Sequence, residues 1–359
     1  MKKIIFGIIT LLAISCNEKP EMEFSLSAIT NGFENGDLIY LDYNNISIDS
    51  TEITDNSFEF KTKLPNTPMQ LWIRNKDFSN YRAFWAEDKP MTFDATKTDF
   101  RNAKIEGSET QKQDDILTQR LKTIQTEMEN IENSFNESMT EIEIESVTNQ
   151  YKLLENKEII TNQEFVKEFS TSIVSAFILD LYATTWGKEK TLELFDKFSS
   201  ENKNSKYGKK IDSYIRLNKE PKIGDLFADF EMEKQNGKTI KLSEVKGKTI
   251  LLEFWASWCG PCRVENPNLV KTYNTYKPKG FEILAVSLDT DKNNWIEAIK
   301  KDNLNWKHVS DLKGQANKAF LIYGINVIPD NFLISENGII IGRNLRGEEL
   351  NQKLSEVLE

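Results

Sequence analysis

The sequence predicts a multi-domain chain in which an all-β, sandwich-like domain and an α-helical segment precede a C-terminal α/β domain. Three observations support this prediction. The chain has 359 residues, more than the ~100–200 residues of one ordinary domain. The hydrophobic pattern changes twice, from short alternating runs to helical spacing and then to strands interleaved with helices. Hydrophobic residues make up 39% and charged residues 28%, a composition that permits buried cores and disfavours a disordered chain.

The composition also argues against several classes of function. The chain has 46 basic and 56 acidic residues and a formal net charge of −10, which disfavours nucleic acid as a partner because that affinity comes from clustered Lys and Arg. It contains three cysteines, Cys16, Cys259 and Cys262, and one histidine, His308. This set is too small for most metal sites and for a disulfide-dense scaffold. We therefore expect no metal and no other cofactor.

Residues 1–15 have the form of a signal peptide. Two lysines precede the apolar run Ile4–Ile14, which is too short for a bilayer core that needs ~20 helical residues. The small residue before Cys16 makes this junction similar to a bacterial lipobox, in which the cysteine is lipidated, although Ala13 stands where the lipobox usually has leucine. We expect a cell-envelope protein, on the periplasmic side or outer surface, anchored to the membrane by lipidated Cys16. Plain secretion with cleavage nearby is the alternative.

Residues 16–108 are expected to form the all-β domain. Short alternating runs such as residues 38–41, 57–61 and 69–73 are separated by turn residues, which is the pattern of strands with one buried face. The aromatic residues here lie at strand spacing and are interpreted as core residues. No catalytic constellation occurs in this domain.

Residues 109–218 are expected to be α-helical. Apolar residues repeat at steps of four and three, which places one apolar stripe along a helix: Leu117, Leu121, Ile124, Met128, Ile131, Phe135, Met139 and Ile142. Such a stripe packs either on its own domain or in a coiled-coil dimer, so the oligomeric state stays open. Further helices are expected over residues 165–182, 189–198 and 205–217. The first of these is apolar enough for side chains such as Leu181 to be buried.

Residues 219–359 are expected to form the α/β domain. Pro221 follows the last helical stretch and marks the boundary. Strands are expected over residues 249–254, 281–288, 331–334 and 339–343, and helices over residues 262–276, 293–301, 315–323 and 348–358. An Asn-Gly pair between the last two strands predicts a hairpin turn.

Cys259 and Cys262 lie where a buried strand is followed directly by a helix. Two thiols separated by two residues can close a small disulfide ring, and the helix dipole favours the thiolate of the first. We expect Cys259 to be the nucleophile, exposed at the turn, and Cys262 to resolve the mixed disulfide with substrate. A zinc site would need two further ligands, and a permanent structural disulfide across so short a loop would constrain the unfolded chain little.

The run FWASWCGPCR, residues 254–263, resembles the active site of the thioredoxin superfamily, and more closely that of TlpA/ResA-like exported thiol-disulfide oxidoreductases. The resemblance extends over residues 222–359 and implies a thioredoxin fold there. Pro267 matches the proline that kinks the active-site helix. Ile328 and Pro329 match the position of the cis-proline that faces the disulfide and helps to hold an extended substrate segment. The remaining residues that the resemblance places at the substrate site are Trp258, Gly260 and Pro261.

Two glutamates are candidate site residues through the same resemblance. Glu253 stands where thioredoxins carry a buried acid that would accept the proton of Cys262, a role that a burial-raised pKa suits. The alternative is a half-exposed strand glutamate paired with a lysine. Glu265 matches a TlpA/ResA glutamate near the active site, and its alternative is an exposed helix residue. His308 is expected to be structural.

We expect an exported, membrane-anchored thiol-disulfide oxidoreductase that reduces disulfide-containing proteins, because the Gly-Pro pair between the cysteines resembles reducing members of the superfamily. A reducing enzyme outside the cytoplasm requires electrons, so a membrane thiol electron donor is expected as a partner. One alternative is a peroxiredoxin-like peroxidase, although the residues before Cys259 lack that class's Pro-x-x-x-Thr-x-x-Cys pattern. The other is a non-catalytic, partner-binding surface lipoprotein. The first β domain resembles an uncharacterised domain that commonly precedes TlpA-like modules and carries no assigned function.

Overall fold

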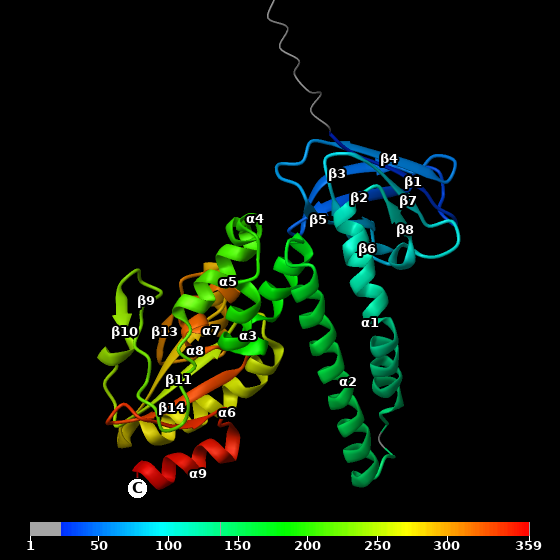
Figure 1. Cartoon of the computed structure of the whole chain (residues 1–359). Coiled ribbons are helices and arrows are strands. Elements are labelled where there is room, and N and C mark those ends of the chain that lie inside the picture. Colours follow the sequence, from blue (N-terminus) through cyan, green and yellow to red (C-terminus); the bar gives the residue numbers. More distant parts are fainter. Residues whose placement is uncertain (1–22, 137, 359) are drawn as a thin grey trace, which may run out of the picture. The chain divides into compact units, whose positions relative to one another are not determined.

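The computed structural model describes residues 23–136 and 138–358, which form two compact units divided between Glu155 and Asn156 (Figure 1). The predicted signal peptide and the candidate lipidation site Cys16 lie outside the described residues. Within the described ranges, no helix combines the length and the apolar character required to span a membrane.

From residue 23 onward, the first unit contains eight strands in two four-stranded sheets. One sheet has the order β4-β1-β7-β8, with β1 parallel to β7, and the other has the order β3-β2-β5-β6 and is antiparallel. Apolar side chains of both sheets share one core, in which the rings of Phe24 and Phe84 lie 6.3 Å apart. The strands are β1 (Phe24–Ile29), β2 (Leu38–Tyr43), β3 (Ile46–Glu52), β4 (Ser57–Thr62), β5 (Met69–Asn75), β6 (Tyr81–Ala86), β7 (Pro90–Asp94) and β8 (Lys104–Glu106). This β-rich region agrees with the all-β character expected from the sequence.

Helix α1 (Glu109–Ser134) follows β8 and is fixed to the strands at its N-terminus. The Ser108 hydroxyl caps the helix by accepting a hydrogen bond of 3.0 Å from the Gln111 N–H. The Gln111 side-chain oxygen in turn accepts a bond of 2.8 Å from the N–H of Trp85 in β6. The start of the helical segment is therefore set by side chains that also pair with the sheet.

The prediction of one helix along the whole stripe from Leu117 to Ile142 is wrong. Helix α1 ends at Ser134, and α2 (Glu141–Glu168) begins after a short connection. Thr140 and Glu143 form a capping box, in which the Glu143 N–H donates to the Thr140 hydroxyl (3.3 Å) and the Thr140 N–H donates to the Glu143 carboxylate (2.8 Å). This motif starts a new helix, and Ile142 in its first turn is exposed.

The expected helix over residues 165–182 is also interrupted. Helix α2 ends at Glu168, and Ser172 caps the next helix by accepting a hydrogen bond of 3.1 Å from the Val174 N–H. The following helices are α3 (Ile173–Phe195), α4 (Ser200–Asn204) and α5 (Lys206–Leu217). Leu181, which was expected to be buried, is 52% exposed, because it lies on the side of α3 that lines a cavity.

The second unit contains a five-stranded mixed sheet of order β13-β12-β11-β14-β15 (Figure 1). The pairs β11–β12 and β12–β13 are parallel, and β11–β14 and β14–β15 are antiparallel. The strands are β11 (Thr249–Trp255), β12 (Phe281–Ser287), β13 (Lys307–Val309), β14 (Asp330–Ser335) and β15 (Ile340–Arg343), preceded by the hairpin of β9 (Glu231–Glu233) and β10 (Thr239–Lys241). Together with its helices this is the thioredoxin-like fold that the resemblance implied.

Helices cover both faces of this sheet. The Tyr273 ring of α6 lies 6.3 Å from that of Phe281 in β12, and the Tyr323 ring of α8 lies 5.7 Å from that of Phe254 in β11. Because strand residues alternate between faces, Glu253 lies on the same face as α6. The helices are α6 (Gly260–Tyr276), α7 (Lys292–Lys301), α8 (Lys318–Tyr323) and α9 (Gly347–Leu358).

Helices α3 to α5 belong to the same compact unit as this sheet. After α5, the Asn218 side-chain amide donates to the Leu321 carbonyl oxygen (2.9 Å), and the Lys219 N–H donates to that of Ile322 (2.9 Å). These bonds fix the end of α5 to α8, so α3 to α5 are attached to the domain that contains the sheet.

Candidate active site

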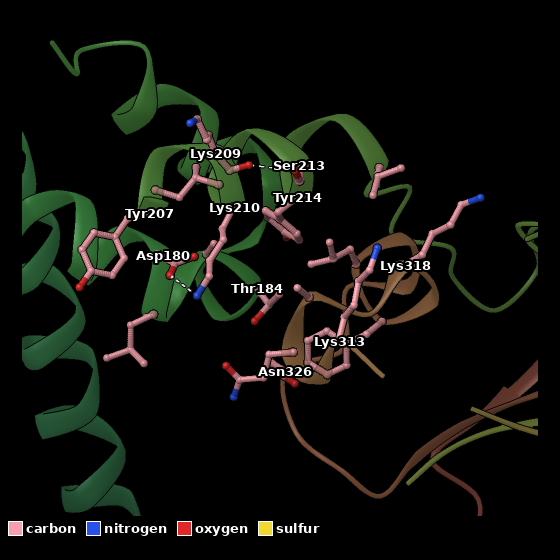
Figure 2. Close-up of a pocket in the computed structure, with 18 of the residues that line it drawn as sticks. Asp180, Thr184, Tyr207, Lys209, Lys210, Ser213, Tyr214, Lys313, Lys318 and Asn326 are labelled. Atoms are coloured by element: carbon pink, nitrogen blue, oxygen red, sulfur yellow. Dashed lines mark hydrogen bonds and ion pairs between the residues drawn. The ribbon is translucent and has the colours of Figure 1, made fainter. Parts of the chain in front are cut away.

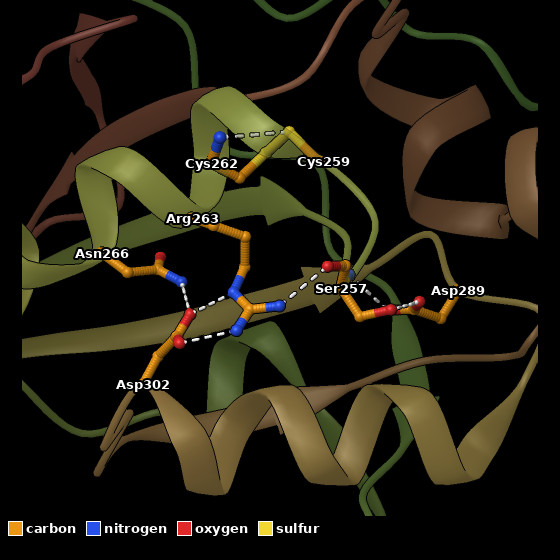
Figure 3. Close-up of polar contacts among 7 residues, drawn as sticks. All are labelled: Ser257, Cys259, Cys262, Arg263, Asn266, Asp289 and Asp302. Atoms are coloured by element: carbon orange, nitrogen blue, oxygen red, sulfur yellow. Dashed lines mark hydrogen bonds and ion pairs between the residues drawn. A yellow bond between two sulfur atoms is a disulfide. The ribbon is translucent and has the colours of Figure 1, made fainter.

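Cys259 and Cys262 are joined by a disulfide at the first turn of α6, with their Cα atoms 5.3 Å apart (Figure 3). The Cys262 N–H donates a hydrogen bond of 3.2 Å to the Cys259 sulfur, which occupies the N-cap position. Cys259 is 4% exposed, so the expectation of an exposed sulfur is wrong for this oxidised state. The bond to Cys262 turns the sulfur toward the helix end. After reduction, the positive end of the helix dipole would stabilise a thiolate there.

The turn before Cys259 is held by Arg263 (Figure 3). Its guanidinium donates to the Ser257 carbonyl oxygen at 2.9 Å and makes a two-pronged contact with Asp302, whose second bond measures 2.7 Å. The Asn266 side-chain amide donates to the same carboxylate at 2.7 Å. Since a bidentate Arg–carboxylate pair has a fixed geometry, this network orients the first turn of α6 relative to the end of α7.

Asp289 holds the same turn from the neighbouring strand (Figure 3). Its buried carboxylate accepts hydrogen bonds from the Ser257 N–H (3.0 Å) and the Ser257 hydroxyl, and from the Ser287 hydroxyl (2.6 Å). Ser287 ends β12, which pairs in parallel with β11. The residues at the carboxyl ends of two adjacent parallel strands therefore fix the approach to the disulfide.

Glu253 is a buried carboxyl group on the α6 face of the sheet, with 7% of its surface exposed. Burial raises its pKa from 4.5 to about 8, against the opposing effects of the Arg346 charge and a hydrogen bond from Asn331. Asn331 is the residue opposite Glu253 in the antiparallel β11–β14 pair. A carboxyl group with such a pKa can take up and release a proton near neutral pH.

The Ile328–Pro329 peptide bond is cis, as the resemblance implied. Pro329 is buried and Ile328 is half-buried. The Pro329 carbonyl oxygen accepts a hydrogen bond of 2.5 Å from the guanidinium of Arg346, which also donates to the Asn344 side chain at 2.7 Å. Arg346 therefore holds the proline loop and also, through its charge, lowers the pKa of Glu253.

Glu265 is half-buried and bridges two helices. One carboxylate oxygen accepts a hydrogen bond of 3.1 Å from the Gly347 N–H at the start of α9, and the other accepts one of 3.2 Å from the Asn268 side chain. Its negative charge is one of the causes that raise the pKa of Glu253. The alternative of an exposed helix residue is therefore wrong.

Three of the predicted substrate-side residues are exposed. Trp258 is 65% exposed, and Gly260 and Pro261 are also exposed. Val264 in the first turns of α6 and Val327 before the cis-proline are exposed as well. Apolar surface thus borders both segments that carry the candidate site.

His308 is buried in β13 and lies far from Cys259 and Cys262 in the sequence. Its ring lies 5.6 Å from Trp255 and 5.8 Å from Trp306, and Nε2 lies 3.2 Å from the Leu304 carbonyl oxygen. Burial lowers its pKa from 6.5 to about 3. A neutral, packed ring is consistent with the structural role expected from the sequence.

Comparisons with known proteins match two regions of the chain. Residues 223–343 match the AhpC/TSA family, and residues 24–113 match a domain of unknown function, DUF4369. The thiol-disulfide oxidoreductase ResA of Bacillus thuringiensis subsp. konkukian is 32% identical over 146 residues, which are 41% of this chain and 82% of that protein. ResA of Bacillus subtilis is 35% identical over 113 residues, 32% of this chain and 62% of that protein.

The chain belongs to the ResA-like thiol-disulfide oxidoreductases. The match covers most of the first ResA protein, and the AhpC/TSA match over residues 223–343 includes Cys259 and Cys262. The resemblance found in the sequence is confirmed, and the chain is an enzyme of that class. A solved thiol-disulfide oxidoreductase from Bacteroides fragilis is 36% identical over 37% of this chain and all of its own, with a TM-score of 0.36. Membership of the family implies disulfide-containing substrates.

Sequence reasoning missed four residues that hold the site of this ResA-like enzyme: Arg263, Asp289, Asp302 and Arg346. A polar residue directly after a predicted parallel strand was an available signal for Asp289, because carboxyl ends of such strands meet at one edge of the sheet. Asp302 and Arg346 carried no local signal. They reach the site only through the packing of α7 and of the β15–α9 connection.

Proposed function

We propose that the chain reduces disulfide bonds in proteins by dithiol–disulfide exchange, with Cys259 as nucleophile and Cys262 as resolving thiol. The observation that carries this proposal is the Cys259–Cys262 disulfide at the N-terminus of α6, with a buried carboxyl group on the same face of the sheet. The exposed Trp258 and the cis-proline loop supply a surface for an extended substrate segment.

The reaction begins with the reduced enzyme. The Cys259 thiolate attacks one sulfur of the substrate disulfide, the substrate disulfide breaks, and its other sulfur leaves as a thiolate that takes a proton. The Cys262 thiolate then attacks the Cys259 sulfur of the mixed disulfide, which forms the Cys259–Cys262 bond and releases the second substrate thiol. The two electrons of the enzyme dithiol reduce the substrate.

Glu253 would accept the proton of Cys262 in the second step. Its pKa of about 8 lies close to that of an ordinary thiol, ~8.5, so transfer of a proton from Cys262 to the ionised form of Glu253 is nearly balanced in free energy. Glu265 acts through Glu253, since its charge helps to raise that pKa, and is a positioning residue.

The site of action that we propose is the cell envelope, with lipidated Cys16 as the membrane anchor. Support comes from the signal-like first 15 residues and the small residue before Cys16. Each turnover leaves the enzyme oxidised, so a membrane thiol electron donor is proposed as the partner that restores the dithiol.

The test is reduction of insulin by the full chain with dithiothreitol as electron source. Wild type should accelerate precipitation of the insulin B chain, and Cys259→Ser should not. The reduction potential of the Cys259–Cys262 couple should lie near the reducing thioredoxin value of ~−270 mV, and a value near ~−120 mV would contradict reduction. Activity in neither chain would favour a non-catalytic lipoprotein.

A peroxidase is the second candidate, because residues 223–343 match the AhpC/TSA family. Peroxide would oxidise Cys259 directly and would not need Cys262 for the first step. Peroxide consumption that persists in Cys262→Ser would favour this candidate, and its loss together with insulin reduction in wild type would favour disulfide exchange.

A further inference from the structure

A cavity of about 670 Å³ lies in the C-terminal unit (Figure 2), and neither cysteine of the disulfide lines it. Helices α3 and α5 form one wall, and the chain from Asp311 to Asn326, which includes α8, forms the other. All of the lining residues belong to the unit from Asn156 to Glu359. The volume falls within the ~300–1,000 Å³ typical of sites for small organic ligands.

Part of the cavity lining is apolar, and this part is called the floor below. Phe177 and Leu181 of α3, Ile211 of α5 and Phe320 of α8 line it. Leu181 stands out because it is 52% exposed within a helix whose other apolar side chains are mostly buried. The chain thus places an apolar side chain at this position and leaves it uncovered, which favours an apolar ligand group.

The rim of the cavity is basic. Four lysines line it, Lys209, Lys210, Lys313 and Lys318, against two aspartates. This balance is the reverse of that in the whole chain, whose formal net charge is −10. A basic cavity on an acidic protein favours an anionic ligand over a cationic one.

The two aspartates offset half of this positive charge. Asp180 pairs with Lys210 at 3.3 Å, and Figure 2 shows the lysine pointing toward that carboxylate. The Asp311 carboxylate accepts hydrogen bonds from the Asn317 side chain (2.8 Å) and from the Lys318 N–H (3.0 Å), both close by in its own loop.

The remaining lysines have no carboxylate at ion-pair distance within residues 23–136 and 138–358: Lys209, Lys313 and Lys318. These three lysines line the cavity, and their positive charges have no ion-pair partner within those residues. An anionic group there would lie beside a net positive charge, since the four lysines outnumber the two aspartates.

We propose that this cavity binds an amphipathic organic anion, with its hydrocarbon part on the floor at Leu181 and its carboxylate or phosphate at the lysine rim. A fatty acid or alkyl phosphate free in solution and a lipid of a membrane surface share this chemistry. The proposal stands apart from disulfide exchange, because no lining residue belongs to the disulfide or its supporting network. The wall ends at Asn326, two residues before Ile328, so a ligand here would touch the segment that leads to the cis-proline loop.

The first test is calorimetric titration of the full chain with decyl phosphate below its micelle concentration. We expect saturable binding of one molecule per chain, and at least about tenfold weaker binding of inorganic phosphate and of the neutral decyl maltoside. Equal binding of decyl phosphate and decyl maltoside, or no saturable binding of decyl phosphate, would overturn the proposal.

Variants locate the ligand. Leu181→Asp should weaken decyl phosphate binding at least about tenfold, since it places a carboxylate on the apolar floor. Leu153→Asp, at an exposed leucine of α2 outside the cavity, is the matched control and should bind as wild type does. Unchanged binding in Leu181→Asp would contradict the assigned site.

Charge reversal tests the rim separately. Lys313→Glu/Lys318→Glu should weaken decyl phosphate binding about threefold to tenfold and leave decyl maltoside unaffected. Lys292→Glu/Lys300→Glu, at exposed lysines of α7, provides the same change in net charge away from the cavity. Equal loss in both pairs would show a general charge effect and overturn the rim assignment.

Two further experiments ask whether the anion comes from a membrane or from solution, and whether its binding depends on the disulfide site. Sedimentation with phosphatidylglycerol vesicles that depends on Leu181 identifies a membrane lipid, whereas decyl phosphate binding without vesicle binding identifies a soluble amphiphile. Cys259→Ser should bind decyl phosphate as tightly as wild type. Loss of binding in that variant would place the ligand at the disulfide and contradict the proposed cavity.

Discussion

Replacement of Glu253 by glutamine removes the carboxyl group whose pKa the fold raises from 4.5 to about 8. In the unfolded chain this group ionises near pH 4.5, and in the folded chain only near pH 8. Between these values the folded state holds a proton that unfolding releases, so the free energy of unfolding falls as pH rises. A pKa change of this size corresponds to about 5 kcal/mol, fully present below pH 4.5 and lost once pH has passed 8.

The glutamine variant cannot ionise and lacks this pH dependence. Between pH 5 and pH 9, the free energy of unfolding of Glu253→Gln should therefore gain about 4 kcal/mol relative to wild type. We would measure urea unfolding of the oxidised full chain by pulsed hydrogen exchange in peptides from β11, which report on the C-terminal unit. Wild type and Glu253→Gln share all their other titratable groups, so the contributions of those groups cancel in the difference between the two proteins.

Glu297→Gln is the matched control, because Glu297 is an exposed glutamate of α7 in the same unit. Its free-energy difference from wild type should stay nearly constant over the same pH range. A difference between Glu253→Gln and wild type that is equally independent of pH would refute the reasoning, since it would mean that the Glu253 carboxyl group ionises at the same pH in both states.

Three other predictions follow from the same contacts. Arg346→Gln should raise the pKa of Glu253 further, because the Arg346 charge lowers that pKa. The pH midpoint of mixed-disulfide resolution, measured in single-turnover experiments, should therefore move upward. Arg346→Lys keeps the charge and should restore the wild-type midpoint. The ring of His308 should not titrate in NMR spectra between pH 8 and pH 5, because burial lowers its pKa to about 3, and a midpoint near 6.5 would contradict this burial. Asp302→Asn should lower the free energy of unfolding by about 1.5–3 kcal/mol, because it weakens the charged hydrogen bonds to Arg263; unchanged stability in urea would contradict that network.

The sequence was most informative where the chemistry is local. Cys259 and Cys262 are three residues apart, and they lie between a continuous apolar strand and the start of a helix, so the motif and its fold could be predicted together. The burial of Cys259 could not, because it depends on the disulfide and on packing around the turn. Arg346 reaches Pro329 from the loop after β15, the strand paired with β14, and that loop has no motif of its own.

The helical segment shows a different limit. Hydrophobic spacing indicated which residues share a helix face, but the same spacing continues across the break between α1 and α2. Polar residues determine where that break lies. Thr140 and Glu143 form a capping box that was visible in the sequence, yet the regular apolar period around it outweighed this signal. Leu181 shows that periodicity predicts which helix face is apolar but not whether another element covers that face.

The most direct test of the central claim is capture of the covalent intermediate. In Cys262→Ser the nucleophile remains and the resolving thiol is lost, so the full chain incubated with a disulfide-containing protein should accumulate a mixed disulfide through Cys259, visible as a dithiothreitol-sensitive shift on non-reducing gels and by mass spectrometry. Cys259→Ser should form none at that position. Accumulation through Cys262 in Cys259→Ser, or no mixed disulfide in Cys262→Ser, would contradict the proposed exchange mechanism.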